Sequence, residues 1–288
     1  MYDVIIIGAG PAGISASLYI KRANLDPLII YNDKSSLEKT EKIENYYGFE
    51  NGIDGKKLYE DGINQAKNLD IDIKNEEVIK IEFEENGYSV TTSKNKYNSK
   101  VVILATGNKK NTPNIKGIKE FEGKGISYCA ICDGFFYKDK NVVVIGSGNY
   151  AISETNDLIN ISKEITILTN GKDAPEIRAD NVKVNDKEIR EIRGNSRAEE
   201  IEFSDNTTLK TDGIFIAEGV AGSQEFAKKL GIITKNNKII VNEKMETNIP
   251  GIYACGDCTE GLLQISKAVY QGTVAGLEAI KYLKNRIE

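Results

Sequence analysis

The stretch YCAICDG, residues 128–134, places two cysteines two positions apart and a carboxylate directly after them. Two thiols at this spacing close a small ring, so one can attack a partner disulfide while the other resolves the mixed disulfide. Asp133 is suited to give and take the protons of that exchange. Because the chain has no histidine, no other nearby side chain is as well suited. An aspartate before a glycine is also ordinary turn chemistry, and that alternative stays open here.

The four cysteines could bind a metal ion, form a structural disulfide or act as a redox-active dithiol. A zinc site would combine Cys129 and Cys132 with Cys255 and Cys258, but the stretch between the pairs is far longer than zinc-ribbon spacing. We expect no metal. A structural disulfide is disfavoured in a reducing compartment, so we interpret the first pair as a redox dithiol. The second pair is more typical of small residues on a buried strand.

The bulk composition is that of a globular chain long enough for two domains. It has 288 residues, of which 40% are apolar and 28% charged, with a formal net charge of -5. This acidic net charge gives no sign of a basic surface, so we expect neither a nucleic acid nor a membrane surface as partner. The chain starts with a strand pattern and has no long apolar run. We therefore expect a cytoplasmic protein.

Two strand–turn–helix patterns, about 140 residues apart, carry glycine-rich turns. In the first, the apolar run 3–7 leads into Gly8-x-Gly10-x-x-Gly13 and then into helical spacing. In that turn, Gly8 permits the bend, Gly10 lets the backbone approach a pyrophosphate, and Gly13 allows close helix–strand packing. The second, NVVVIGSGNYA at 141–151, repeats the arrangement with alanine in the last position.

Two further buried strands end in small residues, KVVILATGN at 100–108 and GIYACGDCT at 251–259. Their positions predict an α/β fold of two doubly wound, Rossmann-like domains in which the second domain interrupts the first. We expect a first domain at 1–111 that returns at 241–288, and an inserted domain at 112–240 that carries the redox pair.

These motifs together resemble the low-molecular-weight thioredoxin reductases, which are flavoprotein disulfide reductases. Five segments follow one another in the order and with the spacing of that family: GAGPAG, IENYYGF, LATG, GISYCAICDGFFYKDKNVVVIGSGNYA and YACGDCTEGLLQISKAVYQG. The resemblance implies an FAD domain, an inserted pyridine-nucleotide domain with the active disulfide, and a homodimer that reduces a thioredoxin-like protein. It also implies that Cys132 faces the flavin, that Cys129 exchanges with the substrate, and that Asp133 handles protons.

The resemblance further implies an FAD site, position by position. The residues expected to hold FAD are Gly8, Gly10, Pro11, Ala12, Gly13, Asp33, Asn45, Thr106, Gly107, Gly256, Asp257, Gln264 and Ile265.

One segment departs from the family pattern, and it puts NADP in doubt as a cofactor. After the strand EITIL, the residues Thr169 to Lys172 offer neither an arginine cluster for a 2′-phosphate nor a carboxylate for ribose hydroxyls. The crossover to the next strand, NVKVN, is also short for a full helix. Alternatively, Lys172 or Arg178 replaces the missing cluster.

Some members of the wider family take electrons from ferredoxin, and we expect ferredoxin or flavodoxin as donor here. Two readings compete with this hypothesis. One is a conventional NAD(P)H-dependent thioredoxin reductase. The other is a flavin electron carrier, or a ferredoxin- or flavodoxin-NADP reductase, in which the cysteines do not turn over.

Overall fold

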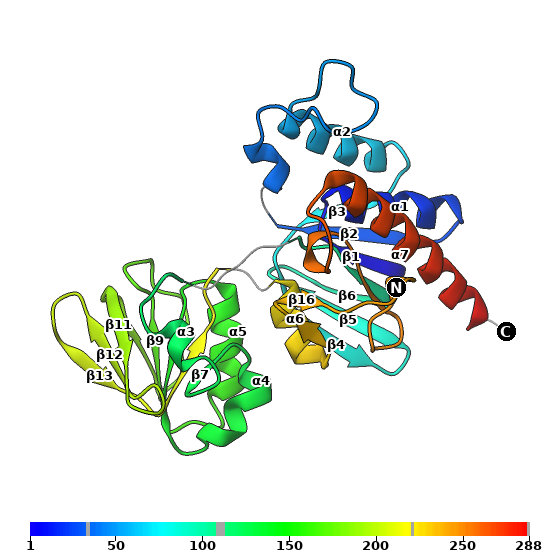
Figure 1. Cartoon of the computed structure of the whole chain (residues 1–288). Coiled ribbons are helices and arrows are strands. Elements are labelled where there is room, and N and C mark those ends of the chain that lie inside the picture. Colours follow the sequence, from blue (N-terminus) through cyan, green and yellow to red (C-terminus); the bar gives the residue numbers. More distant parts are fainter. Residues whose placement is uncertain (33–34, 108–112, 220–221, 287–288) are drawn as a thin grey trace. The chain divides into compact units, whose positions relative to one another are not determined.

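The computed structural model describes residues 1–32, 35–107, 113–219 and 222–286 (Figure 1). The chain forms two compact units, Met1–Lys109 with Gly222–Glu288, and Lys110–Ala221. The second unit interrupts the first, as the sequence predicts. The return to the first unit comes at Gly222 and therefore earlier than the expected residue 241, because helix α6 (Ser223–Leu230) contacts strand β4 (Val78–Glu84) of the first unit.

The first unit is built on a seven-stranded sheet that combines a parallel core with an antiparallel extension. Strands β3, β2, β1, β6 and β17 run parallel, while β4 and β5 continue from β6 in antiparallel order. Their bounds are β1 (Tyr2–Ile7), β2 (Pro27–Tyr31), β3 (Asp72–Asn75), β4 (Val78–Glu84), β5 (Gly87–Thr92), β6 (Lys96–Leu104) and β17 (Ile252–Ala254). The apolar runs in β1, β2 and β6 are fully buried, which is typical of central parallel strands.

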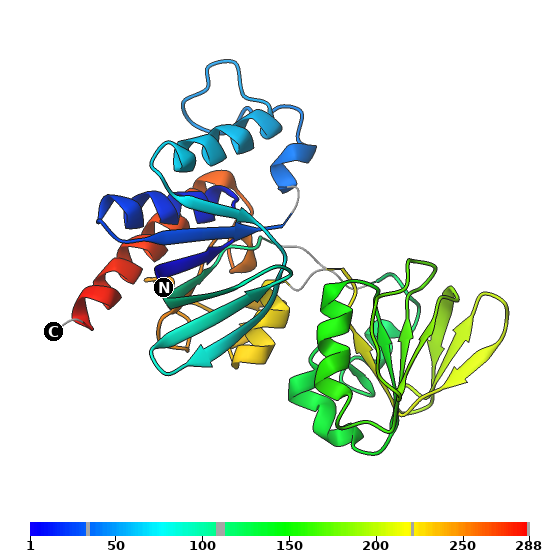
Figure 2. The same cartoon turned by 180° about the vertical axis from the view of Figure 1, so that it is seen from behind.

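Helices α1 (Pro11–Arg22) and α7 (Ile265–Asn285) pack side by side against this sheet (Figures 1 and 2). Helix α1 begins with Pro11, whose missing N–H costs nothing in a first turn, and ends with two basic residues that suit the helix dipole. Helix α2 (Gly55–Lys67) contacts α1, and Asp54 caps its first turn. A short hairpin, β15 (Thr234–Lys235) and β16 (Lys238–Ile239), follows α6.

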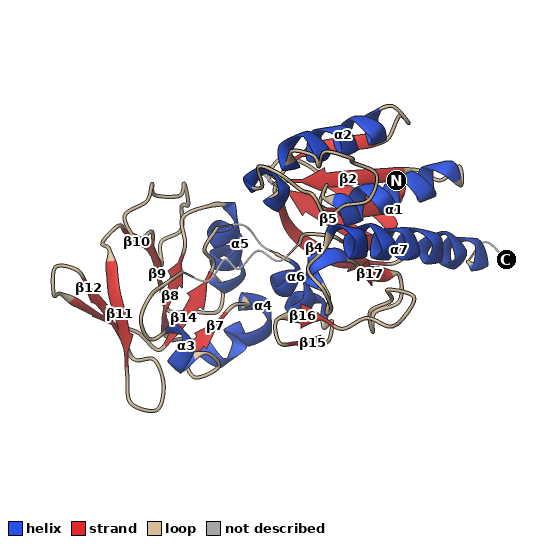
Figure 3. Ribbon diagram, turned by 45° about the horizontal axis from the view of Figure 1, so that its top comes forward, coloured by secondary structure: helices blue, strands red, loops and turns tan. Residues whose placement is uncertain are grey.

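The second unit repeats the parallel plan with five strands in the order β10, β9, β8, β14 and β7 (Figure 3). Helix α5 (Asn149–Leu158) packs on β8 and β9. The other elements are β7 (Ile126–Ser127), β8 (Asn141–Ile145), β9 (Glu164–Leu168), β10 (Val182–Asn185), β14 (Gly213–Ile216), α3 (Ile118–Phe121) and α4 (Ala130–Asp133). A separate antiparallel sheet contains β11 (Ile189–Arg193), β12 (Glu200–Phe203) and β13 (Thr208–Lys210).

The crossover from β9 to β10 confirms one local prediction. Residues 169–181 are all described and form no helix, although β9 and β10 pair in parallel. A Rossmann unit usually places a helix there. Among the described residues of the whole chain, no helix is both long and apolar enough to cross a membrane.

Candidate active site

Three strand ends of the first unit form one edge at which a dinucleotide could bind. Ile7 of β1 pairs with Leu104 of β6, and Leu104 pairs on its other side with Ala254 of β17. The residues that follow these three strands therefore lie at the same level, although they are far apart in sequence. Strand order reverses between β1 and β6, and ligands of open α/β sheets bind at such a switch point.

The first glycine turn has the geometry that its sequence predicts. Gly8 adopts φ +115°, and a Cβ there would lie 2.2 Å from the carbonyl oxygen of Ala105. A Cβ on Gly13 would lie 1.9 Å from the carbonyl oxygen of Gly8, so the helix packs directly on the turn. At Gly10, in contrast, a Cβ would meet no atom within 4 Å among those described. That open space before the α1 N-terminus suits a pyrophosphate.

Two other strand ends contribute polar and small residues to this edge. The hydroxyl oxygen of Thr106, after β6, is buried and has no hydrogen-bond partner in the described part of the chain. Gly256 after β17 adopts φ +77°, and Asp257 is half-buried in the short 3-10 helix η3 (Gly256–Cys258). Gly107, after Thr106, also adopts a positive φ of +73°. A buried hydroxyl is stabilised by a hydrogen bond, so Thr106 is suited to contact a ligand at this edge.

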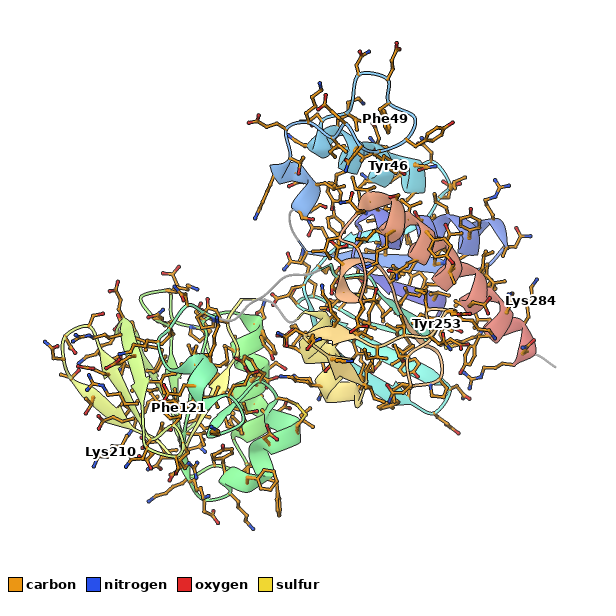
Figure 4. All side chains as sticks on the ribbon, in the orientation of Figure 1. Tyr46, Phe49, Phe121, Lys210, Tyr253 and Lys284 are labelled. Atoms are coloured by element: carbon orange, nitrogen blue, oxygen red, sulfur yellow. A yellow bond between two sulfur atoms is a disulfide. The ribbon has the colours of Figure 1, made fainter. Side chains whose placement is uncertain are left out.

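The expected flavin-side residues come together from opposite ends of the chain. The Asn45 amide donates to the side-chain oxygen of Gln264 at 3.1 Å. Gln264 is the N-cap of α7, and Ile265 is its first residue. Figure 4 labels Tyr46 and Phe49, whose rings stack at 6.0 Å on the loop that Asn45 begins. Asp33, the expected ribose partner, lies outside the described residues.

In the second unit, Cys129 and Cys132 form a disulfide. Cys129 is only 2% exposed, whereas Cys132 belongs to the exposed residues. The backbone N–H of Cys132 donates to the Cys129 sulfur at 3.2 Å. When the disulfide opens, this N–H can stabilise a thiolate on Cys129, since thiolates are favoured by nearby donors.

Asp133 lies beside this disulfide and belongs to its hydrogen-bond network. The Ser127 hydroxyl donates to the Asp133 carboxylate at 2.6 Å and accepts the Cys129 N–H at 3.1 Å. The Asp133 N–H donates to the carbonyl oxygen of Cys129 at 3.1 Å. These contacts tie the Asp133 carboxylate, through Ser127, to the backbone of the redox loop.

The second glycine turn reproduces the first in backbone detail. A Cβ on Gly146 would lie 2.1 Å from the carbonyl oxygen of Ala217, which is the contact that Gly8 has with Ala105. The N–H of Ala217 donates to Ile145, as that of Ala105 donates to Ile7. AEG at 217–219 therefore occupies the place of ATG at 105–107, so that Glu218 is the counterpart of Thr106.

The side chains around this second turn are committed to internal contacts. Thr169 is fully buried and its hydroxyl donates to the Lys172 carbonyl at 2.7 Å. The side-chain oxygen of Asn170 accepts the N–H of Ile189 at 2.7 Å. Lys172 pairs with Glu218. The strand end that would hold a ribose in a Rossmann unit is thus already occupied by protein contacts.

The second cysteine pair lies in the first unit, and its environment is that of inert thiols. Cys255 and Cys258 are unoxidised and buried. Burial raises the pKa of both thiols, that of Cys258 to about 11. A thiol with a raised pKa has little thiolate at neutral pH and reacts slowly. In the described ranges, no group of three or more His, Cys, Asp or Glu side chains could hold a metal ion.

Comparison with known proteins assigns the family. The model of the pyridine nucleotide-disulphide oxidoreductase family matches residues 2–272. The chain belongs to this family. A thioredoxin reductase of Ureaplasma parvum serovar 3 is 36% identical, with 98% of this chain and 97% of that protein covered.

Solved structures of the same type extend this assignment to the fold. An atypical thioredoxin reductase of Desulfovibrio vulgaris Hildenborough is 34% identical, with a TM-score of 0.91 and 99% of each chain covered. A ferredoxin-flavin thioredoxin reductase of Clostridium acetobutylicum is also 34% identical, with a TM-score of 0.71 over 99% of this chain and 98% of that one. The protein is a disulfide oxidoreductase of the thioredoxin reductase type, and its α/β, Rossmann-like fold is confirmed.

The residues of the first unit fit the FAD that is typical of this family. Gly10 leaves room at the N-terminus of α1, and among the described residues the Thr106 hydroxyl has no hydrogen-bond partner. Asn45 and Gln264, which are hydrogen-bonded to each other, would hold the flavin end of the cofactor. When bound, FAD would supply the electrons that open the disulfide.

Two acidic residues near the expected sites escaped the sequence reasoning. Glu218 could have been noticed from the parallel between ATG and AEG after the two switch-point strands. Glu154 on α5 is fully buried and accepts the N–H of Ala130, the residue between Cys129 and Ile131. No local pattern marks Glu154, because its importance depends on which segment packs over α5.

Proposed function

We propose that this oxidoreductase uses FAD and the Cys129–Cys132 pair to reduce the disulfide of a thioredoxin-like protein, with ferredoxin or flavodoxin as electron donor. The single observation that carries the donor assignment is the occupied strand end in the second unit. Thr169 and Asn170 make internal hydrogen bonds at this strand end. Glu218 occupies the position that corresponds to Thr106 in the first unit.

The cysteine chemistry follows from the disulfide and its neighbours. Two electrons and two protons convert the Cys129–Cys132 disulfide to a dithiol. The Cys129 thiolate then attacks the substrate disulfide, and Cys132 resolves the mixed disulfide, restoring the oxidised pair. Because Cys129 is buried in the oxidised state, this role requires the reduced loop to expose it. Asp133, held by Ser127, exchanges the protons.

The second glycine turn is a poor site for NADPH on electrostatic grounds. A pyrophosphate over Gly148 would approach the segment of Glu218, since a Cβ on Gly148 would lie 3.7 Å from the carbonyl oxygen of Gly219. Glu218 stands where the first site has a neutral threonine, and its ion pair with Lys172 keeps that lysine from a phosphate. The missing bidentate arginine–phosphate contact alone is worth about 1.5–3 kcal/mol.

Thermodynamics permits a ferredoxin donor. Plant-type ferredoxins have potentials near about −400 mV and thioredoxin near about −270 mV, so two electrons release about 6 kcal/mol. One of the similar structures is named a ferredoxin-flavin thioredoxin reductase, which supports the same donor for this chain. The conventional alternative is an NAD(P)H-linked thioredoxin reductase, and the retained turn at Gly146 and Gly148 favours it.

An anaerobic titration distinguishes the donors. The purified flavoprotein is mixed in turn with NADPH, NADH and reduced ferredoxin, and the flavin absorption band is followed. We expect rapid bleaching by ferredoxin and slow bleaching by either nucleotide, followed by reduction of added thioredoxin. Rapid bleaching by micromolar NADPH would return the protein to the conventional class. A correctly folded protein that takes up no flavin would contradict the proposal altogether.

We further propose that the protein works as a cytoplasmic homodimer, as its resemblance to thioredoxin reductases implies. A dithiol enzyme that reduces disulfides is expected in a reducing compartment, where thiols are kept reduced. Light scattering on the flavin-loaded protein tests the assembly, and a monomer at micromolar concentration would contradict it.

A further inference from the structure

Helix α5 holds the redox loop by two hydrogen bonds, one on each side of Cys129. The Tyr150 hydroxyl donates to the carbonyl oxygen of Tyr128 at 3.1 Å. The N–H of Ala130 donates to the Glu154 carboxylate at 2.7 Å. Tyr150 is 1% exposed and Glu154 is 0% exposed, so both anchoring side chains are buried. The peptide groups before and after Cys129 are thereby fixed to the same helix.

The bond to Glu154 is the shorter of the two anchors. A buried carboxyl group is costly unless its oxygens are hydrogen-bonded. A polar side chain retained at such a cost is a sign of a specific role. The N–H that Glu154 holds belongs to the residue directly after Cys129, so its position sets the direction in which the loop leaves that cysteine.

The remaining contacts of Cys129 complete this arrangement. Its N–H donates to Ser127 and its carbonyl oxygen accepts the N–H of Asp133. Cys129 is therefore held inside while Cys132, three positions later, is exposed. The two cysteines of one disulfide thus differ in exposure, and the backbone around the buried one is fixed on both sides.

We propose that Glu154 is a positioning residue for the redox disulfide. Through the Ala130 N–H it keeps Cys129 buried, so that a reductant reaches the sulfur of Cys132. An attacking thiolate then forms a bond to the Cys132 sulfur, the disulfide bond breaks, and Cys129 leaves as a thiolate that the Cys132 N–H stabilises. This assignment rests on the proposed disulfide chemistry but requires no particular donor.

The same role explains why the second glycine turn persists. Gly146 lets α5 start at a fixed place on β8, since a Cβ there would lie 2.1 Å from the carbonyl oxygen of Ala217. Helix α5 carries Tyr150 and Glu154 to the redox loop, and a helix displaced by a side chain at Gly146 would lose both anchors. The turn is thus useful for the disulfide even where it binds no nucleotide.

Attack by glutathione measures this selectivity directly. The oxidised, flavin-loaded full chain is treated briefly with glutathione and quenched with N-ethylmaleimide, and peptide mass spectrometry locates the glutathione and the alkyl group. In the unaltered protein we expect glutathione on Cys132 and alkylation on Cys129, with a preference of at least about tenfold, because reactivity follows exposure.

Three substitutions and one control separate the role of Glu154 from general stability. Glu154→Ala should reduce the preference to about threefold or less, and Glu154→Asp, which withdraws the carboxylate, should reduce it partly. Glu154→Gln keeps an oxygen acceptor and should stay near the unaltered value. Glu202→Gln is the matched control, because Glu202 is also a buried carboxylate of this unit but pairs with Arg190 and Arg193.

An unchanged preference in folded Glu154→Ala would overturn the inference, as would glutathione found mainly on Cys129 in the unaltered protein. If Glu154→Ala does not fold, an unchanged preference in Glu154→Asp has the same meaning. The assay contains neither ferredoxin, nucleotide nor thioredoxin. A failure of the proposed function in its own titration would therefore leave this result unaffected, and the two failures remain distinguishable.

Discussion

The two units contain the same strand–turn–helix arrangement but use it differently. In the first, Gly10 has open space beside it and the Thr106 hydroxyl has no partner within the described ranges, which suits a dinucleotide. In the second, Glu218 replaces that threonine and pairs with Lys172, while the helix that follows the turn supports the disulfide loop. The shared turn fixes how a helix packs on a strand. The neighbouring strand ends decide what, if anything, binds there.

The strongest test asks whether the second unit acts through its disulfide. Cys129→Ser or Cys132→Ser should lower thioredoxin reduction by more than about 10³-fold, because neither single thiol can complete the exchange. Cys132→Ser should also trap a mixed disulfide on Cys129. Cys129→Ser should show a long-wavelength charge-transfer band from a thiolate beside the flavin.

Non-reducing mass spectrometry and absorption spectroscopy check these two signatures. Cys258→Ser is the control and should retain activity, because that thiol is buried and its pKa is raised to about 11. If the trapped species and the band are exchanged between the two variants, the assigned roles of the cysteines are reversed.

A smaller effect is expected at Asp133, the proposed proton donor and acceptor of the second unit. Asp133→Asn should slow thiol–disulfide exchange about 10²-fold, the usual contribution of a positioned acid or base. Stopped-flow oxidation of the reduced enzyme by thioredoxin measures this step. Asp139→Asn, at a turn on the same segment, is the control. Equal rates for Asp133→Asn and the unaltered enzyme would leave Asp133 as a turn residue only.

The two glycine turns can be compared by one matched pair of substitutions. A Cβ on Gly10 meets no described atom within 4 Å, and one on Gly148 meets only an oxygen at 3.7 Å, so neither alanine should disturb the fold. Gly10→Ala should nevertheless weaken FAD binding about tenfold or more by crowding the pyrophosphate. Gly148→Ala should leave FAD binding and ferredoxin-driven activity unchanged. Equal effects on activity would erase the functional difference between the turns.

The smallest effect concerns Glu218, the residue of the second unit that corresponds to Thr106 in the first. Glu218→Thr restores the residue type of the first site and removes a negative charge, which should strengthen NADPH binding about three- to tenfold. Equilibrium titration of the flavoprotein with NADP⁺ measures the change. Glu176→Gln, an exposed carboxylate of the same unit, is the control. Weaker or unchanged binding in Glu218→Thr would show that Glu218 does not exclude the nucleotide.

Much of the architecture could be predicted because it depends on local patterns. The apolar runs at β1, β6, β8 and β9 became buried strands, and both glycine turns became strand-to-helix bends. The redox spacing of Cys129 and Cys132 was visible for the same reason, since a ring of that size needs no distant partner. The second unit boundary was misplaced because α6 packs by its contacts with β4, which the sequence does not show.

The sequence by itself determined the two Rossmann-like turns, the redox pair and the absence of an arginine cluster after β9. Tertiary structure alone decided that the Thr106 hydroxyl is buried with no partner in the described part of the chain, that Glu218 pairs with Lys172, and that Glu154 bonds to the disulfide loop. Burial and hydrogen bonding depend on segments that meet only after folding. Parallel strands in particular bring together residues that lie far apart in the chain, and a local sequence pattern does not indicate which residues will be in contact.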